Sequence, residues 1–294
     1  MSEKIPFYGG QALIEGVLMR GSKIAVATIK GYDGQIHIHQ EDLGAIYQGK
    51  IKTTPFLRGI IALWDAMFLG TRFLTISANH QTDKPEEQIT GKSLYVTLAI
   101  SLGIGILIFF VAPASLSHLF ESFLGINPWM GNLIEGAIRV VLLVGYLALI
   151  QQIPDVKRVF MYHGAEHKTI NAFEAGSELT SDSVSKYSLV HPRCGTSFIL
   201  TVVVFSVILF SLLGPLPLFW RIISRLVFVI PIASISYEYI RWSAKHLSNP
   251  IIAILIKPNL WLQKLTTAEP NLDMIDIAIT SLKEVIKNED LITA

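Results

Sequence analysis

The sequence predicts a mainly α-helical membrane protein with about four transmembrane helices and a small cytoplasmic α+β part that includes an N-terminal β-hairpin. The first observation is composition: 51% of the 294 residues are hydrophobic and only 16% are charged, against about 25% in an average soluble domain. The second is that the charges are missing from a few long runs. The third is the net charge of +1, which excludes the broad basic surface of proteins that bind nucleic acid.

The N-terminal segment, residues 1–92, is expected to be cytoplasmic, with β-structure over residues 9–40. Two runs of strand-forming residues, 23–30 and 35–40, flank a Gly/Asp turn and predict a hairpin. His37 and His39 alternate with isoleucines in the second run, so they share one face of the strand. These histidines form either a metal-binding pair or a solvated strand face, and we favour the solvated face.

The next apolar segment, residues 56–78, carries three charges at a spacing of seven: Arg58, Asp65 and Arg72. Such a segment is typical of an amphipathic helix that lies on the inner membrane surface or packs under a helix bundle. The alternative is a fifth membrane-spanning helix.

Four further runs are long and apolar enough to span a bilayer, which takes about 20 residues. They are 94–111, 133–153, 198–213 and 219–240. Pro113 is expected to end the first helix. We assign these runs to a transmembrane bundle over residues 93–240, with a cytoplasmic loop at 154–197; buried helices of a large soluble core are the alternative.

The distribution of lysine and arginine predicts the orientation. Residues 1–92 hold ten, the 154–197 loop holds five and residues 239–294 hold six, whereas the 114–132 loop holds none. Because cytoplasmic loops are enriched in positive charge, we expect a multi-pass membrane protein with both termini and the 154–197 loop in the cytoplasm. The C-terminal tail, residues 241–294, includes an amphipathic helix that is expected to pack on the cytoplasmic part.

Five charged residues lie inside the apolar runs: Glu238 near the inner end of the last run, and four others that lie near the opposite end of their runs. Glu135 and Arg139 are one helical turn apart, and so are Arg221 and Arg225, at similar expected depth. Intramembrane charges tend to pair, but one glutamate cannot neutralise three arginines. The sequence therefore predicts either arginines that extend to the membrane interface or a bound anion such as a lipid headgroup.

The strongest chemical signal is H-x-x-E-H at residues 163–167. On a helix, His163 and His167 project to the same side, and Glu166 lies beside them. Two neutral imidazoles suit Zn²⁺, and the carboxylate is a candidate base; the inverzincin proteases use the same five-residue pattern. The alternative is a solvated loop whose histidines bind nothing.

A second element, H-x-x-C, supplies His191 and Cys194, the only cysteine. Both elements border membrane segments on the same predicted side, so four ligands come within reach of one another. Four protein ligands would make a closed, structural site. Three ligands with Glu166 unligated would leave room for hydrolysis.

Several longer motifs carry a resemblance to a known family. They are residues 9–21 (GGQALIEGVLMRG), 162–168 (YHGAEHK), 191–198 (HPRCGTSF) and 261–270 with its Trp-Leu-Gln, Thr-Thr and Glu-Pro pieces. In these motifs the sequence resembles the DUF1385 family of bacterial membrane proteins. Members are described as metal-dependent enzymes without an established reaction, so the resemblance implies a metal site and a membrane location but no substrate.

The resemblance also implies that the N-terminal motif belongs to a shared core. Glu15 is the only acidic residue in that glycine-rich stretch. It is either a base or metal ligand of the site, or part of a close-packed turn in which it pairs with Arg20.

The leading functional hypothesis is a hydrolase that depends on a divalent metal, expected to be zinc, and acts at the cytoplasmic membrane interface. His163, His167 and one of His191 or Cys194 would hold the metal, and Glu166 or Glu15 would transfer protons. The substrate would be membrane-associated, and the protein could form homo-oligomers in the lipid bilayer. The alternatives are a non-enzymatic scaffold or regulator with a structural zinc, and an oligomeric anion transporter or channel.

Overall fold

The computed structural model describes residues 8–44, 54–214 and 216–293. The chain divides into two compact units. The first contains Met1–Ile89, Ile150–His191 and Gln263–Ala294, and the second contains Thr90–Leu149 and Pro192–Leu262. Segments that are far apart in the sequence therefore build the first unit together.

A four-stranded antiparallel sheet forms the centre of the first unit, within the described residues. Its strands are β1 (Gly9–Leu13), β2 (Gly16–Arg20), β3 (Ile24–Lys30) and β4 (Ile36–Asp42), in the spatial order of the sequence. The predicted hairpin is confirmed as β3 and β4, which pair from Ile24 with Asp42 to Lys30 with Ile36. Gly34 in the connecting turn has a φ of 79°, which glycine adopts without strain.

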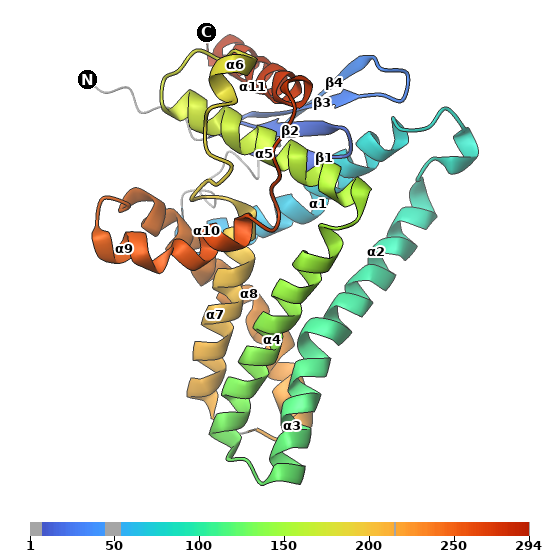
Figure 1. The fold of residues 1–294 in the computed structure, drawn as a ribbon. Helices are drawn as coiled ribbons and strands as arrows, with labels where there is room; N and C mark the ends of the chain where they lie inside the picture. The colour runs from blue at the N-terminus through green and yellow to red at the C-terminus, as the bar shows by residue number, and fades with distance from the viewer. Residues whose placement is uncertain (1–7, 45–53, 215, 294) are drawn as a thin grey trace. The chain divides into compact units, whose positions relative to one another are not determined.

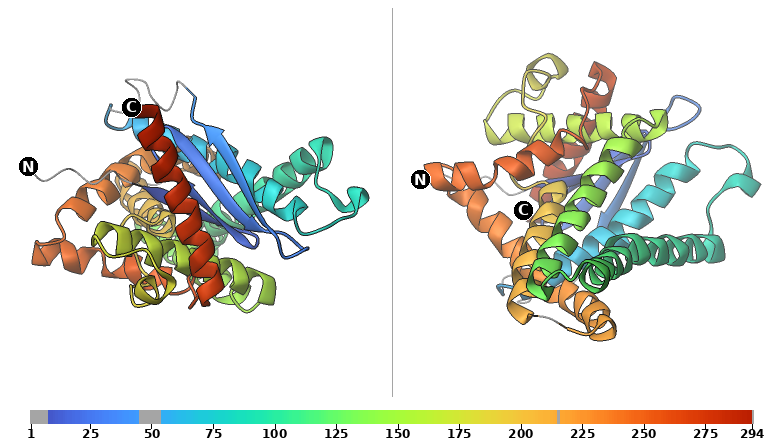
Figure 2. Two further views of the ribbon diagram at one scale, coloured as in Figure 1. Left: turned by 90° about the horizontal axis from the view of Figure 1, so that it is seen from above. Right: turned by 60° about the horizontal axis from the view of Figure 1, so that its bottom comes forward.

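Helices cover both faces of this sheet. On one face lie α5 (Pro154–Glu174) and α11 (Leu272–Thr293), and Figure 2 shows α11, in red, crossing the strands. Val17 and Val26 pack there with Ile275 and Leu282 of α11. The expected packing of the C-terminal amphipathic helix is confirmed.

The opposite face of the sheet is covered by α1 (Leu57–Asn79), the helix that the sequence placed on the membrane surface or under the bundle. Leu69 and Phe73 of α1 pack with inward residues of the sheet. Asp65 forms an ion pair with Arg20 of β2, and Arg72 forms one with Glu41 of β4 at 2.8 Å. Two of the three charges that mark this helix thus bind strands of the same unit.

The other side of α1 exposes large apolar side chains. Trp64 and Phe68 stack with ring centroids 3.8 Å apart, and each is more than half exposed. A 3₁₀ turn, η3 (Pro85–Glu87), follows α1.

The second unit is helical in its described residues (Figure 1). It contains α2 (Gly91–Ile106), the π-helical η4 (Leu107–Val111), α3 (Ala112–Leu124), α4 (Pro128–Ile150), α7 (Gly195–Leu213), α8 (Leu218–Lys245), α9 (Pro250–Leu255) and most of α10 (Lys257–Gln263). Together with α1, five helices of the described chain have the length and composition to cross a membrane. Three of the four apolar runs lie within such helices, and the run 133–153 extends past the end of α4 at Ile150.

Pro113 does not end the apolar helix that begins at Ser93, contrary to the expectation from the sequence. The helix continues from Ser93 to Leu124. Proline lacks an N–H and its ring displaces the carbonyl four residues earlier, which is that of Phe109. The π-helical stretch precedes Pro113, and Nε of Arg139 donates to the Phe109 carbonyl at 3.0 Å. The donor that proline lacks is therefore replaced by a side chain from α4.

The packing of α11 on the sheet generates a stability prediction. Replacing the fully buried Leu282 by alanine should reduce the free energy of unfolding by about 2–5 kcal/mol, because it leaves a cavity in the core. Thermal unfolding of the detergent-solubilised protein measures the loss. Lys283→Ala, next to it and exposed, is the control; equal effects of the two substitutions would contradict this packing.

Candidate metal centre

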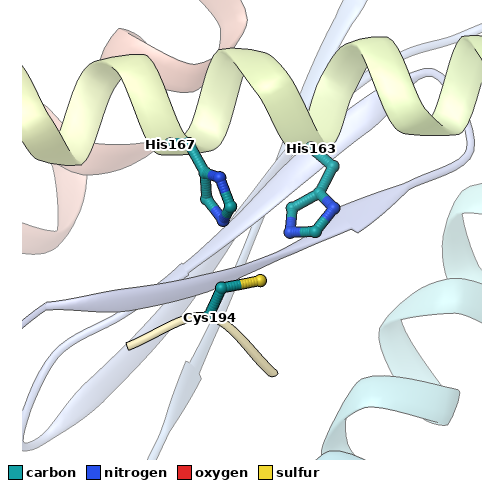
Figure 3. A group of neighbouring side chains, drawn as sticks. All are labelled: His163, His167 and Cys194. Carbon is teal, nitrogen blue, oxygen red and sulfur yellow. The ribbon is translucent and has the colours of Figure 1, made fainter. Parts of the chain in front are cut away.

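The H-x-x-E-H motif lies in α5, in the first unit. The rings of His163 and His167 are one turn apart with their centroids 4.4 Å from each other. A ligand nitrogen of one lies within 4.8 Å of a ligand nitrogen of the other. Figure 3 shows both imidazoles projecting from the same face of the helix. Both imidazoles therefore point to the same side of the helix, as two ligands of one metal ion must.

Backbone carbonyls fix the orientation of both rings. Nδ1 of His163 lies 2.8 Å from the carbonyl oxygen of Thr266, and Nδ1 of His167 lies 2.6 Å from that of Leu189. A carbonyl oxygen only accepts, so each Nδ1 carries the proton and donates. In a neutral imidazole, Nε2 is then the nitrogen with the lone pair. Metal-binding histidines are commonly oriented by such a hydrogen bond from the second nitrogen.

His191 is held in the same unit by Gln263. The amide of Gln263 accepts from the His191 backbone N–H at 2.9 Å and donates to the His191 carbonyl at 2.9 Å. The His191 ring centroid is 5.9 Å from that of His167, and its Nε2 lies 3.4 Å from a carboxylate oxygen of Glu174. A third imidazole is therefore adjacent to the pair on α5.

Cys194 belongs to the second unit, three residues after His191. It is buried and caps the N-terminus of α7, where its Sγ accepts from the backbone N–H of Thr196 at 3.3 Å. Figure 3 draws Cys194 with His163 and His167. Three extended residues span at most about 11 Å, so the chain itself keeps Cys194 near His191.

Glu166 is 5% exposed and faces the edge strand β1. The backbone N–H of Gly10 donates to its carboxylate. A Cβ at Gly10 would lie 2.9 Å from the Glu166 side chain and 2.7 Å from the Leu18 carbonyl, so this approach requires glycine. Burial raises the pKa of Glu166 to about 7, against the opposite influences of His163 and the Gly10 hydrogen bond. The carboxyl therefore exchanges its proton near neutral pH.

Glu15, the other predicted proton carrier, forms an ion pair with α5. Nε and Nη2 of Arg158 bind its two carboxylate oxygens at 2.5 and 2.6 Å, and the Tyr162 hydroxyl donates to it at 3.2 Å. The hydrogen bond from Arg158 is the main reason that the pKa of Glu15 is lowered. The alternative in which Glu15 pairs with Arg20 is wrong, since Glu15 binds Arg158 and Arg20 binds Asp65.

Three contacts of α5, made by Lys168 and Gly164, could not be foreseen from the sequence. Lys168 is buried and donates to the Ser185 carbonyl at 2.6 Å, and it forms an ion pair with Glu269 at 2.8 Å. A Cβ at Gly164 would lie 2.2 Å from the Ala268 carbonyl oxygen. The segment 263–269 therefore lies directly against the motif. The sequence pointed to this segment because it lies in one of the motifs that resemble the DUF1385 family.

The charged cluster of the second unit is buried. Glu135 binds Arg139 at 2.8 Å and Arg225 at 2.9 Å, and Glu121 binds Arg221 at 2.8 Å. The three arginines are 1–4% exposed, which contradicts the expectation that they extend to an interface. The sequence assigned Glu121 to a loop; it lies on α3 because the helix continues past Pro113.

The Arg221 guanidinium has more hydrogen-bond donors than the neighbouring side chains have acceptors for it. Its Nη2 binds Glu121, whereas Nε and Nη1 are buried and have no hydrogen-bond partner among the described residues. In this part of the chain the three arginines thus face two glutamates.

Residues 54–288 match the family model described as "Protein of unknown function (DUF1385)". The chain belongs to the DUF1385 family. It is 34% identical over 308 residues to "Uncharacterized protein YqhQ" of Bacillus subtilis (strain 168), covering 97% of this chain and 94% of that relative. No solved structure matches the chain. This match confirms the family that the motifs predicted. The matched residues of this DUF1385 protein include α5 and the 263–269 segment.

The raised pKa of Glu166 predicts a pH-dependent stability in this DUF1385 protein. Between pH 4.5 and about 7 the folded carboxyl binds a proton that the unfolded one does not, so stability falls as pH rises through this window. The contribution is ~3 kcal/mol. Glu166→Gln should flatten the decline of the melting temperature between pH 5 and pH 8, measured with a chelator present.

Glu178→Gln is the matched control, because Glu178 is exposed on the loop after α5. A decline that is the same in the parent protein and in Glu166→Gln would contradict the burial of this carboxyl.

Proposed function

We propose that this protein is a metal-dependent integral membrane enzyme, a hydrolase that acts at the cytoplasmic membrane interface. The observation that carries the proposal is the pair His163 and His167, both of which donate Nδ1–H to a backbone carbonyl and share one face of α5. Histidines on a solvated loop would donate to water and would not both be held by backbone carbonyls of other segments.

The donor set fits a divalent ion of the zinc type. His163 and His167 supply two imidazoles, and His191 or Cys194 supplies the third ligand; imidazole and thiolate are the ligands that zinc prefers. Such an ion supplies Lewis-acid polarisation of a substrate carbonyl or phosphoryl oxygen. The two hydrogen bonds between the Gln263 side chain and the His191 backbone hold the third imidazole in place.

Glu166 is the proton carrier in this proposal. It lies one residue from His167, is buried, and is held by the Gly10 N–H. Its carboxylate oxygen accepts a proton in one step and returns it in another, which is the role of a general base. Glu15 has a structural role instead, because its two hydrogen bonds to Arg158 fix the first half of α5 against the β1–β2 turn.

A membrane-associated substrate follows from the continuity of the chain. α4 ends at Ile150 and α5 begins at Pro154, so only a few residues separate an apolar helix from the helix with the motif. His191 and Cys194 likewise precede α7, another helix of spanning length. We expect these apolar helices to cross the bacterial inner membrane and to leave the motif at its cytoplasmic surface.

Metal content tests the proposal most simply. The purified parent protein should contain about one zinc-type ion for this site, and His163→Ala and His167→Ala should each lose it. His246→Ala, at an exposed histidine, should retain it. A protein without bound metal, or one whose metal content neither substitution lowers, would refute the proposal.

Coordination number then separates the enzyme from a structural zinc clip. Cobalt-substituted protein should show three protein ligands and an exchangeable position, and its visible spectrum should respond to small anions. Four protein ligands and an unresponsive spectrum would favour the scaffold or regulator.

Arg221 favours a second candidate function, an oligomeric anion transporter or channel, because it has buried donors in excess of its acceptor. Under this alternative, proteoliposomes should show an anion flux that Arg221→Ala abolishes and Arg241→Ala, on the same helix, preserves. The hydrolase proposal expects no such flux.

A further inference from the structure

A second group of histidines lies in the first unit, away from α5. His37 and His39 are half-buried on β4, while Ile36 and Ile38, which alternate with them, are 49% and 44% exposed. An antiparallel strand normally turns its apolar residues inward. The sequence favoured a solvated face for these histidines; in the structure that face of β4 is turned toward α1, and His80 at the end of α1 meets it.

The imidazoles of His37 and His39 both contact that of His80. Nε2 of His39 lies 2.7 Å from Nε2 of His80. The His37 ring stacks on the His80 ring with centroids 4.3 Å apart, and Nε2 of His37 lies 3.6 Å from a carboxylate oxygen of Asp33. A cavity of about 390 Å³ adjoins His37, His80 and Asp33.

The backbone around His80 is fixed rather than adaptable. The Tyr32 N–H donates to the His80 carbonyl at 2.9 Å, and the Gln81 side chain donates to the Lys30 carbonyl at 3.0 Å. The end of α1 is therefore attached to the β3–β4 turn, so that His80 and His39 are brought together by the fold.

We propose that His39 and His80 are the core of a second transition-metal site, with His37 and Asp33 at its edge. Two nitrogens that bind one tetrahedral ion at 2.0–2.1 Å lie about 3.3 Å apart. The observed 2.7 Å between the Nε2 atoms requires only a small opening of the pair. Imidazoles with a carboxylate select ions such as Zn²⁺ and Cu²⁺. The neighbouring cavity gives the ion access and space for a further ligand.

This site would join β4 to the end of α1 independently of the motif on α5. His37 acts as a positioning residue: its stacking on His80 and its contact with Asp33 hold the His80 ring. Groups in that outer position typically change metal affinity by about 10- to 100-fold.

The test uses a full-length background with His163→Ala and His167→Ala, so that failure of the first site does not affect the result. Isothermal titration with Zn²⁺ should detect one saturable site, and Cu²⁺ should give an electron paramagnetic resonance spectrum with nitrogen couplings. Adding His39→Ala or His80→Ala should abolish both signals. Adding His37→Ala should weaken zinc binding about 10- to 100-fold.

His246→Ala in the same background is the control and should leave binding unchanged. His80→Gln guards against loss of folding, because it keeps a polar side chain at the end of α1 while removing the imidazole. Absence of saturable binding in the background protein, or binding that persists with His39 and His80 both replaced, would overturn the proposal.

Discussion

The buried polar side of α5 is the constraint on which the first unit depends. Glu166, His167 and Lys168 are each at most 5% exposed, and burying such groups without hydrogen-bond partners costs several kcal/mol each. Their partners belong to distant segments: the Gly10 N–H, the Leu189 carbonyl, and, for Lys168, the Ser185 carbonyl and the Glu269 carboxylate. The helix can therefore be buried only where those segments meet around it.

This requirement explains why strands, loop and tail assemble as one unit. β1 must present a glycine to Glu166, and the segment after α6 (Ser181–Val184) must present carbonyls to His167 and Lys168. The C-terminal segment supplies the Thr266 carbonyl to His163. The same contacts that satisfy buried groups also orient the imidazoles, so the candidate site is a consequence of how the unit folds.

The second unit also buries polar groups, and there the partners are charged side chains. Arg139 replaces the N–H that Pro113 lacks and also binds Glu135, which binds Arg225 in turn. An isolated charge among apolar helices is costly, whereas a paired and hydrogen-bonded one is tolerated. These contacts join η4, α4 and α8.

Local patterns were predictable from the sequence, and long-range pairings were not. Apolar length, β-alternation and the i, i+4 histidines identified the helices, the hairpin and the motif. Pattern alone could not show that Glu15 binds Arg158 rather than Arg20, or that His80 meets His37 and His39, because partners of comparable chemistry compete along the chain. The prediction at Pro113 failed because a side chain from another helix supplied the missing donor, and Glu121 was missed with it.

The protonation state of the two ring nitrogens in His163 and His167 tests most directly whether the fold orients both imidazoles for a metal ion. Nitrogen-15 NMR of histidine-labelled protein, free of metal and at a pH where the rings are neutral, reports which ring nitrogen carries the proton. We expect Nδ1 to be protonated at both residues, and added Zn²⁺ to shift the signal of the unprotonated Nε2 of each. Protonation at Nε2, or signals that do not respond to zinc, would contradict this orientation.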